Sequence, residues 1–219
     1  MKVTASGAYA SHFTAAEIWG GWVPHQPLTH ISVAAGETRS RRQGLKAHEA
    51  KGSVTVLVHQ RVRVSSPVDT FLAMAALLDL VDLVVLGDSL VRQSRTTPER
   101  LVQAASVCSG PGARLARRAA RLVRRGVDSP MESRLRMLIV LAGLPEPRVN
   151  WIVYDDNGKW RMRFDLSYPA LRLVIEYDDR QHAEDDTQWD RDIERREDMD
   201  RLRLRMVVVR PRSTAAAEH

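Results

Sequence analysis

The 219-residue sequence predicts a mixed α/β protein whose C-terminal part has the element order α-β-β-β-α-β. Apolar and polar residues alternate along residues 161–178, whereas apolar residues recur with a helical period between residues 67 and 125. A composition of 44% hydrophobic and 27% charged residues is typical of a globular protein of one or two domains. We therefore expect a small mixed α/β region, a helical region, an α/β domain and a tail at residues 1–64, 65–128, 129–210 and 211–219.

The stretch RMRFDLSYPALRLVIEYD, residues 161–178, is typical of a β-hairpin. With a tip at residues 170–171, Ser167 faces Val174 and Asp165 faces Glu176. Asp178 lies further along the same face, so three carboxylates gather at one end of the hairpin.

Carboxylates directly opposed across a ladder repel each other unless a cation lies between them. Mg²⁺ (or Mn²⁺) is the natural candidate, because it prefers oxygen ligands and is held by one or two carboxylates with water and a phosphate. The alternative is a surface hairpin with an acidic outer face, and a register slip of one residue would remove the argument.

Basic residues are concentrated in the N-terminal half, where residues 1–128 carry a net charge of +8 and residues 129–210 carry −2. A pI near 10 with clustered arginines is typical of nucleic-acid binders, although such an excess also serves solubility. The single Cys108 excludes an intramolecular disulfide and a cysteine-rich zinc site. An N-terminus without an apolar h-region, and an apolar segment at 71–87 that Asp79 and Asp82 interrupt, predict a cytoplasmic protein with no membrane association.

The first 64 residues carry few strong signals. We expect a short helix at residues 11–19 with Thr14 as its N-cap, and strands at residues 28–34 and 54–64. Five histidines show no metal-ligand spacing, and we interpret them as surface or packing residues: His12, His25, His30, His48 and His59.

Helices are expected at residues 67–79, 81–93, 98–107 and 112–125. In the last of these, a stripe of Leu115, Ala119, Leu122 and Val123 stands against six arginines: Arg114, Arg117, Arg118, Arg121, Arg124 and Arg125. Such a face could follow a DNA backbone. A solvated helix docked by its leucines explains the pattern equally well.

Ser129, Pro130 and Glu132 predict a helix start, with Glu132 as the return half of a capping box. This structural role accounts for Glu132 from local chemistry alone, but the start of the helix could also lie near the acidic end of the hairpin. A strand at 149–154 and a turn at 155–158 complete a three-strand meander with the hairpin. A charged helix at 187–202 and a strand at 206–209, parallel to the sheet, follow it.

Residues 129–210 resemble the very-short-patch-repair (Vsr)-like endonuclease domain of the PD-(D/E)XK nuclease superfamily, over somewhat more than a third of the chain. The residues that carry the resemblance are Glu132 in SPMESRLR, Asp165 in RFDLSYP, Glu176 and Asp178 in VIEYDD, His182 in RQH, and Asp190, Arg191 and Arg195 in WDRDIERR. Residues 1–128 resemble, more vaguely, the antitoxin-like region that precedes such domains.

The resemblance implies a restriction-endonuclease-like fold and a metal-dependent endonuclease that hydrolyses DNA phosphodiester bonds. In that interpretation Asp165 and Glu176 bind Mg²⁺ and Glu132 supports them. Asp178 stands where many members have lysine, so water activation would fall to the metal, helped by His182 as a proton carrier. Arg191 or Arg195 would steady the phosphate or the cluster of carboxylates.

Two further departures concern glycines that are common in the family, because Asp179 and Arg203 stand in their places. The intact Asp165, Glu176 and Asp178 favour the enzyme, whereas the missing lysine and Asp179 favour a second hypothesis. In it the nuclease fold is catalytically degenerate and acts as an antitoxin-like module that binds nucleic acid or a protein partner. RNA as the substrate, a homodimer and a partner of the toxin-antitoxin type all stay open.

Overall fold

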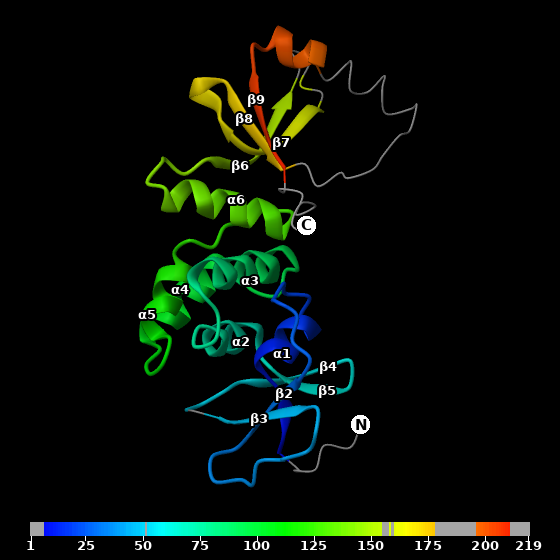
Figure 1. Ribbon diagram of the computed structural model, residues 1–219, viewed down its shortest axis with the longest axis vertical. Coiled ribbons are helices and arrows are strands. Elements are labelled where there is room, and N and C mark those ends of the chain that lie inside the picture. The colour runs from blue at the N-terminus through cyan, green and yellow to red at the C-terminus, as the bar shows by residue number, and fades with distance from the viewer. Residues whose placement is uncertain (1–6, 51, 155–157, 159, 178–195, 211–219) are drawn as a thin grey trace, which may run out of the picture. The chain divides into compact units, whose positions relative to one another are not determined.

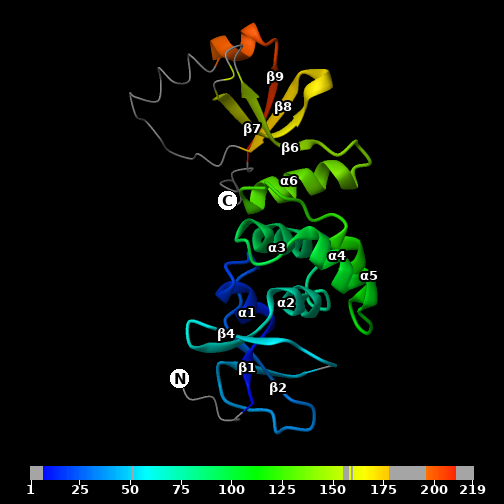
Figure 2. The ribbon, with the colours of Figure 1, turned by 180° about the vertical axis from the view of Figure 1, so that it is seen from behind.

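The computed structural model describes residues 7–50, 52–154, 158, 160–177 and 196–210. It divides into two compact units, residues 1–125 and 126–219, each of which we describe separately (Figures 1 and 2). Each unit contains its own β-sheet with helices packed on it. The chain is therefore a mixed α/β protein, as the sequence predicts, and no helix within the described residues is long and apolar enough to cross a bilayer.

The sheet of the first unit has the strand order β3-β2-β1-β5-β4. Its strands are β1 (Tyr9–Ala10), β2 (Thr29–Val33), β3 (Leu45–Glu49), β4 (Val56–His59) and β5 (Val62–Ser65). The strand expected at 28–34 is confirmed as β2, and residues 54–64 form the β4–β5 hairpin. Gln60 and Arg61 have φ angles of 48° and 65°, which two-residue hairpin turns require. The sequence did not predict β1 and β3.

Five helices accompany this sheet: α1 (His12–Ile18), α2 (Pro67–Met74), α3 (Leu80–Arg92), α4 (Pro98–Val107) and α5 (Ala113–Ala120). The expected helix starts are confirmed, and the side chains of Ser66, Asp79 and Thr97 accept backbone N–H groups as N-caps. The N-cap expected at Thr14 is wrong. Ser11 precedes α1, and Thr14 Oγ1 instead accepts the N–H of His30 at 2.8 Å.

The basic helix is shorter than predicted, because α5 ends at Ala120. The expected stripe is confirmed in part, because Ala119 and Val123 are buried while Leu115 and Leu122 are half-buried. The buried face of α5 itself consists of small side chains: Ala113, Ala116, Ala119 and Ala120. Alanines allow neighbouring backbones to approach closely, and the α-carbon of Gly112 lies against the backbone of Ala75. The buried carboxylate of Asp88 in α3 accepts the N–H of Arg124 at 2.7 Å, which fixes the segment after α5.

The second unit contains α6 (Pro130–Leu141), β6 (Arg148–Tyr154), β7 (Trp160–Tyr168), the 3₁₀ turn η1 (Pro169–Leu171), β8 (Leu173–Tyr177) and β9 (Arg205–Val209). Residues 196–201 are helical, while the rest of the helix expected at 187–202 and the turn residues 155–157 lie outside the described residues. The sheet order β6-β7-β8-β9 confirms the antiparallel meander, and β9 returns parallel to β8.

The predicted hairpin register is confirmed, because Ser167 pairs with Val174. The tip is formed by η1 and by Arg172, which has a φ of 52°. The β7–β8 pairing ends with Leu166 opposite Ile175. In the same register Asp165 and Glu176 are the next residues along, one step beyond the last pair.

Two apolar clusters lie on opposite faces of this sheet, since neighbouring residues in a strand point to opposite faces. Leu135 and Ile139 of α6 pack with Leu166 and Ile175 on one face. The second cluster contains Met162, Phe164, Val174 and Met199, the last from the helix at 196–201. The unit is therefore a three-layer α/β/α arrangement.

The alternation along β7 breaks at Asp165. Leu166 and Phe164, two positions apart, would share a face in a regular strand, yet they belong to clusters on opposite faces. The partner strand is irregular at the same level, where Asn150 has a φ of 52°. The apolar residues of this strand therefore do not all lie on one face, because the strand pair reverses its faces at Asp165.

Candidate functional site

Glu132 is positioned by the first turn of α6. Its N–H donates to Ser129 Oγ at 3.1 Å, and its Oε2 accepts the N–H of Asp128 at 3.0 Å. The side chain is therefore part of the helix cap, as expected, although it bonds the residue before the N-cap and not Ser129 itself. Asp128 also pairs with Arg163 of β7 at 2.9 Å. These bonds hold one carboxylate oxygen of Glu132 in a defined place.

The structure brings Glu132 together with Asp165. Burial raises the pKa of the Glu132 carboxyl, and the nearby charge of Asp165 raises it further, while the hydrogen bond from Asp128 lowers it. Glu132 is 8% exposed. A raised pKa in the folded state means that Glu132 favours folding while it is protonated, and opposes it as pH rises through that pKa. A cation placed beside both carboxylates would offset this cost.

Glu176 lies at the same end of the sheet, one residue past the last β7–β8 pair. Asp165 and Glu176 are both half-buried. Carboxylate oxygens are ligands that Mg²⁺ accepts, but Glu132, Asp165 and Glu176, all among the described residues, do not bring one oxygen each within 4.8 Å of one another. Asp178, His182, Arg191 and Arg195 lie outside the described residues, as do Asp179 and Asp190. Arg203 has a φ of 53°, in the region that glycine adopts without strain.

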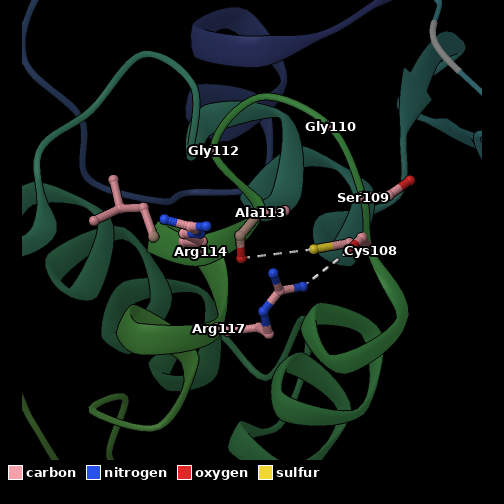
Figure 3. A pocket seen from close by; sticks show the side chains of 8 residues that line it. Cys108, Ser109, Gly110, Gly112, Ala113, Arg114 and Arg117 are labelled. Carbon is pink, nitrogen blue, oxygen red and sulfur yellow. Dashed lines mark hydrogen bonds between the residues drawn. The ribbon is translucent and has the colours of Figure 1, made fainter.

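Three of the six arginines around α5 bond within their own unit. Arg117 donates to Cys108 O at 3.0 Å, Arg124 donates to the carbonyls of Arg121 and Val123, and Arg125 pairs with Glu99. Figure 3 shows the first of these contacts in an open surface pocket at the start of α5.

The remaining three are Arg114, Arg118 and Arg121, which are exposed. Their spacing of four and three residues places them on one side of the helix. Among the described residues the side chains of these three arginines have no hydrogen-bond or ion-pair partner, so they form the accessible part of the predicted arginine face. We call them the arginine triad.

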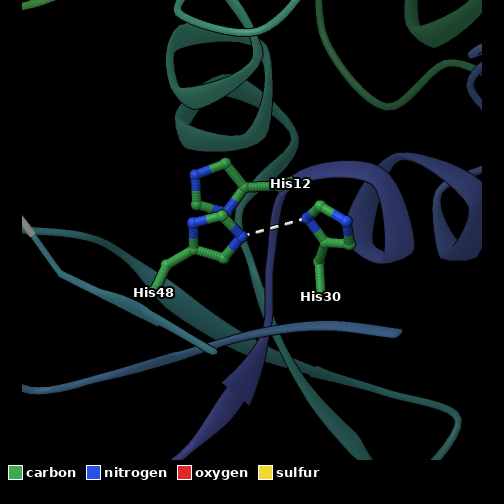
Figure 4. Close-up of side chains that lie close together, drawn as sticks. All are labelled: His12, His30 and His48. Carbon is green, nitrogen blue, oxygen red and sulfur yellow. Dashed lines mark hydrogen bonds between the residues drawn. The ribbon is translucent and has the colours of Figure 1, made fainter. Parts of the chain in front are cut away.

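The structure also assembles a group that the sequence did not predict. His12 at the start of α1, His30 on β2 and His48 on β3 bring one ring nitrogen each within 4.8 Å of one another (Figure 4). These histidines lack metal-ligand spacing in the linear sequence, but the fold brings them close together. Parallel pairing of β2 with β3 brings His30 and His48 together. Because β3 was not predicted, the sequence did not reveal that these two histidines are neighbours.

Comparison of the chain with protein-family models, curated proteins and solved structures returned no match.

Proposed function

We propose that residues 129–210 form a metal-dependent endonuclease domain that hydrolyses DNA phosphodiester bonds. The observation that supports this most directly is the electrostatic coupling of Glu132 and Asp165, beside Glu176 at the end of the β7–β8 pairing. Neighbouring carboxylates such as those of Glu132 and Asp165, one from a helix and one from a strand, favour a divalent cation over an apolar contact. The resemblance of the same residues to a Vsr-like, restriction-endonuclease-like domain points to phosphodiester chemistry.

Asp165 and Glu176 would hold Mg²⁺ (or Mn²⁺), and Glu132 would support them from α6. The ion would lower the pKa of a water molecule and neutralise charge on the phosphate. The Asp128 N–H keeps the Glu132 carboxylate oriented, and the Arg163–Asp128 pair ties this loop to β7. Asp178 would extend the acidic cluster, His182 would carry a proton, and Arg191 or Arg195 would contact the phosphate.

Asp165→Asn and Glu176→Gln are each expected to lower Mg²⁺-dependent DNA cleavage at least about 100-fold, because loss of a ligand should cost no less than loss of an outer-shell partner. The assay follows labelled single-stranded and double-stranded DNA, and RNA of the same sequence, while calorimetry records Mg²⁺ binding. Asp200→Asn changes an exposed carboxylate in the same unit and serves as the matched control. Cleavage that survives Asp165→Asn and Glu176→Gln would contradict the proposal.

Glu132→Gln separates the metal role from the cap role in the same experiment. Glutamine can still accept the Asp128 N–H, so the cap is retained, while the buried negative charge beside Asp165 is removed. Without metal at pH 7.5 the variant should be at least as stable as the wild type, and Mg²⁺ should raise its Tm less. A destabilised variant with an unchanged Mg²⁺ effect would show that Glu132 only caps α6.

A second candidate function is nucleic-acid binding without cleavage, and the arginine triad favours it. Replacement of Arg114, Arg118 and Arg121 by alanine should reduce the slope of log K against log salt by about 2–3, since each phosphate contact contributes roughly 0.9. The control removes three exposed arginines of a loop in the same unit: Arg39, Arg41 and Arg42. Equal reductions of the salt slope in both triple variants would show that the triad contributes only through the net charge of the chain.

A further inference from the structure

We propose that His12, His30 and His48 form a site for a divalent transition metal, with Zn²⁺ as the best-suited ion. The site lies in the first unit and uses none of the carboxylates of Glu132, Asp165 and Glu176. Its test is therefore independent of the test of the proposed nuclease. Imidazole nitrogens suit Zn²⁺, Ni²⁺ and Cu²⁺, whereas Mg²⁺ prefers oxygen. A set of three protein ligands leaves a fourth position for water or a substrate group.

The distances within the group are close to those of a metal site. His48 Nε2 and His30 Nδ1 are 3.0 Å apart, and one nitrogen from each of the three rings lies within 4.8 Å of the other two. Two nitrogens bound to one tetrahedral Zn²⁺ are about 3.3 Å apart, given Zn–N bonds of about 2.0–2.1 Å. The first pair therefore needs a shift of a few tenths of an ångström. The His12 ring, stacked 3.8 Å from that of His48, needs a rotation.

Three different elements fix these side chains in place. His30 is 6% exposed on β2, and its backbone N–H donates to Thr14 Oγ1 in α1. His48 lies on β3, which pairs with β2 over five residues. His12 begins α1, and the Ser11 N–H donates to the carbonyl of His30 at 3.1 Å. The group is therefore held by the pairing of two strands and by the attachment of α1 to one of them.

The backbone of His12 gives independent support. Its φ of 52° lies in the left-handed region, which non-glycine residues occupy at a cost and chiefly where the surroundings impose it. Helix α1 begins at this residue, so the strain accompanies the entry of the chain into the helix and sets the direction of the His12 side chain. Ser11 Oγ bonds His12 Nδ1 at 2.9 Å and accepts a bond from Ser32 Oγ at 2.8 Å. Such outer partners orient imidazole ligands in metal sites.

The protonation of the group is also suitable, because metal ligands must be neutral imidazoles. Burial, followed by the neighbouring histidines, lowers the pKa of His12 to about 3. Burial, then His30 and Lys46, lowers that of His48 to about 4, and burial and Lys46 lower that of His30. All three rings are thus neutral at pH 7. Lys46 opposes any added positive charge and will weaken the site relative to one without a nearby cation.

A packed cluster of neutral histidines is the competing explanation, since the bond between His30 and His48 can be an ordinary N–H···N hydrogen bond. The two explanations differ in their response to metal. Packing alone predicts that transition metals leave the fold stability unchanged. A metal site predicts one bound ion per chain and a higher Tm, because an ion that binds only the folded state stabilises it.

The test titrates the metal-free full chain with Zn²⁺ by calorimetry and with Co²⁺ by visible absorption. To exclude the carboxylate site, the titration is repeated in a Glu132→Gln/Glu176→Gln background, in which Mg²⁺ is the negative control. His48→Ala and His12→Asn remove ligands, and asparagine tolerates the left-handed backbone that position 12 requires. His25→Ala, an exposed histidine of the same unit, is the matched control.

We expect one Zn²⁺ per chain, a tetrahedral Co²⁺ spectrum, and at least about 100-fold weaker binding in both His48→Ala and His12→Asn. His25→Ala should bind as the wild type does. The proposal is overturned if the wild type binds no Zn²⁺, or if both ligand variants retain wild-type affinity and spectrum. Circular dichroism of each metal-free variant shows whether it is folded, so that a loss of binding in a folded His12→Asn variant is decisive.

Discussion

Gly112→Ala is expected to lower the free energy of unfolding by about 2–5 kcal/mol. Gly112 has a φ of 81°, and an added Cβ would lie 2.5 Å from the carbonyl carbon and oxygen of Ala75 and 2.7 Å from Ala76 N. Left-handed backbone costs an L-residue about 1–2 kcal/mol, and overpacking typically adds about 1–3 kcal/mol. The obstacle is backbone, which cannot move aside as a flexible side chain can. Urea unfolding of the full chain measures the loss.

Gly110→Ala is the matched control, because Gly110 lies two residues earlier with a φ of 89° and has nothing within 4 Å of an added Cβ. Only the backbone cost of about 1–2 kcal/mol should remain. Equal destabilisation by the two substitutions would show that Gly112 matters for its φ alone and that α5 does not depend on close packing against Ala75. The salt dependence of DNA binding in Gly112→Ala then reports whether the arginine triad needs α5 in place.

The shortened α5 shows why the sequence predicted this helix only in part. Hydrophobicity ranks Leu115 and Leu122 above alanine, so a pattern argument assigns them to the core. The close approach at Gly112 leaves room for small side chains only, and both leucines are half-buried while Ala116 and Ala119 are buried. Backbone separation between helices is a tertiary property that periodicity does not encode. The sequence predicted the positions of the arginines. It did not predict which of them donate hydrogen bonds to backbone carbonyls.

The β7–β8 hairpin was predicted to the residue because a period of two admits few registers once the tip is known. The break at Asp165 was not predictable, since it depends on Asn150 in another strand, whose left-handed φ leaves no mark on the alternation of β7. The same break explains how Asp165, preceding the buried Leu166, can still lie near Glu132. The histidine group was missed for a related reason, because it needs the parallel pairing of β2 with β3, and β3 was not predicted.

Arg136→Ala is expected to lower the free energy of unfolding by about 3–5 kcal/mol, which is typical when one partner of a buried pair is removed. The Arg136 side chain in α6 is 0% exposed, and its Nη1 donates to Glu146 Oε1 at 2.9 Å. A sequence rarely predicts such a residue, because arginine is almost never fully buried unless it is paired. Thermal and urea unfolding of the full chain check the expectation.

Comparison of Arg136→Met with Arg136→Ala separates the effect of losing the positive charge from the effect of losing side-chain volume. Methionine fills much of the same space without a charge, and Glu146, whose side chain is 31% exposed, can be solvated when its partner is lost. We therefore expect Arg136→Met to cost far less than Arg136→Ala, since apolar replacements of buried ion pairs are often nearly neutral.

Arg136 follows Glu132 by one helical turn, so a displaced α6 would also move the Glu132 carboxylate. Loss of stability in Arg136→Ala with full retention in Arg136→Met would assign Arg136 to packing. If instead Arg136→Met loses Mg²⁺-dependent cleavage while keeping its stability, the buried guanidinium contributes to the electrostatics of the acidic cluster.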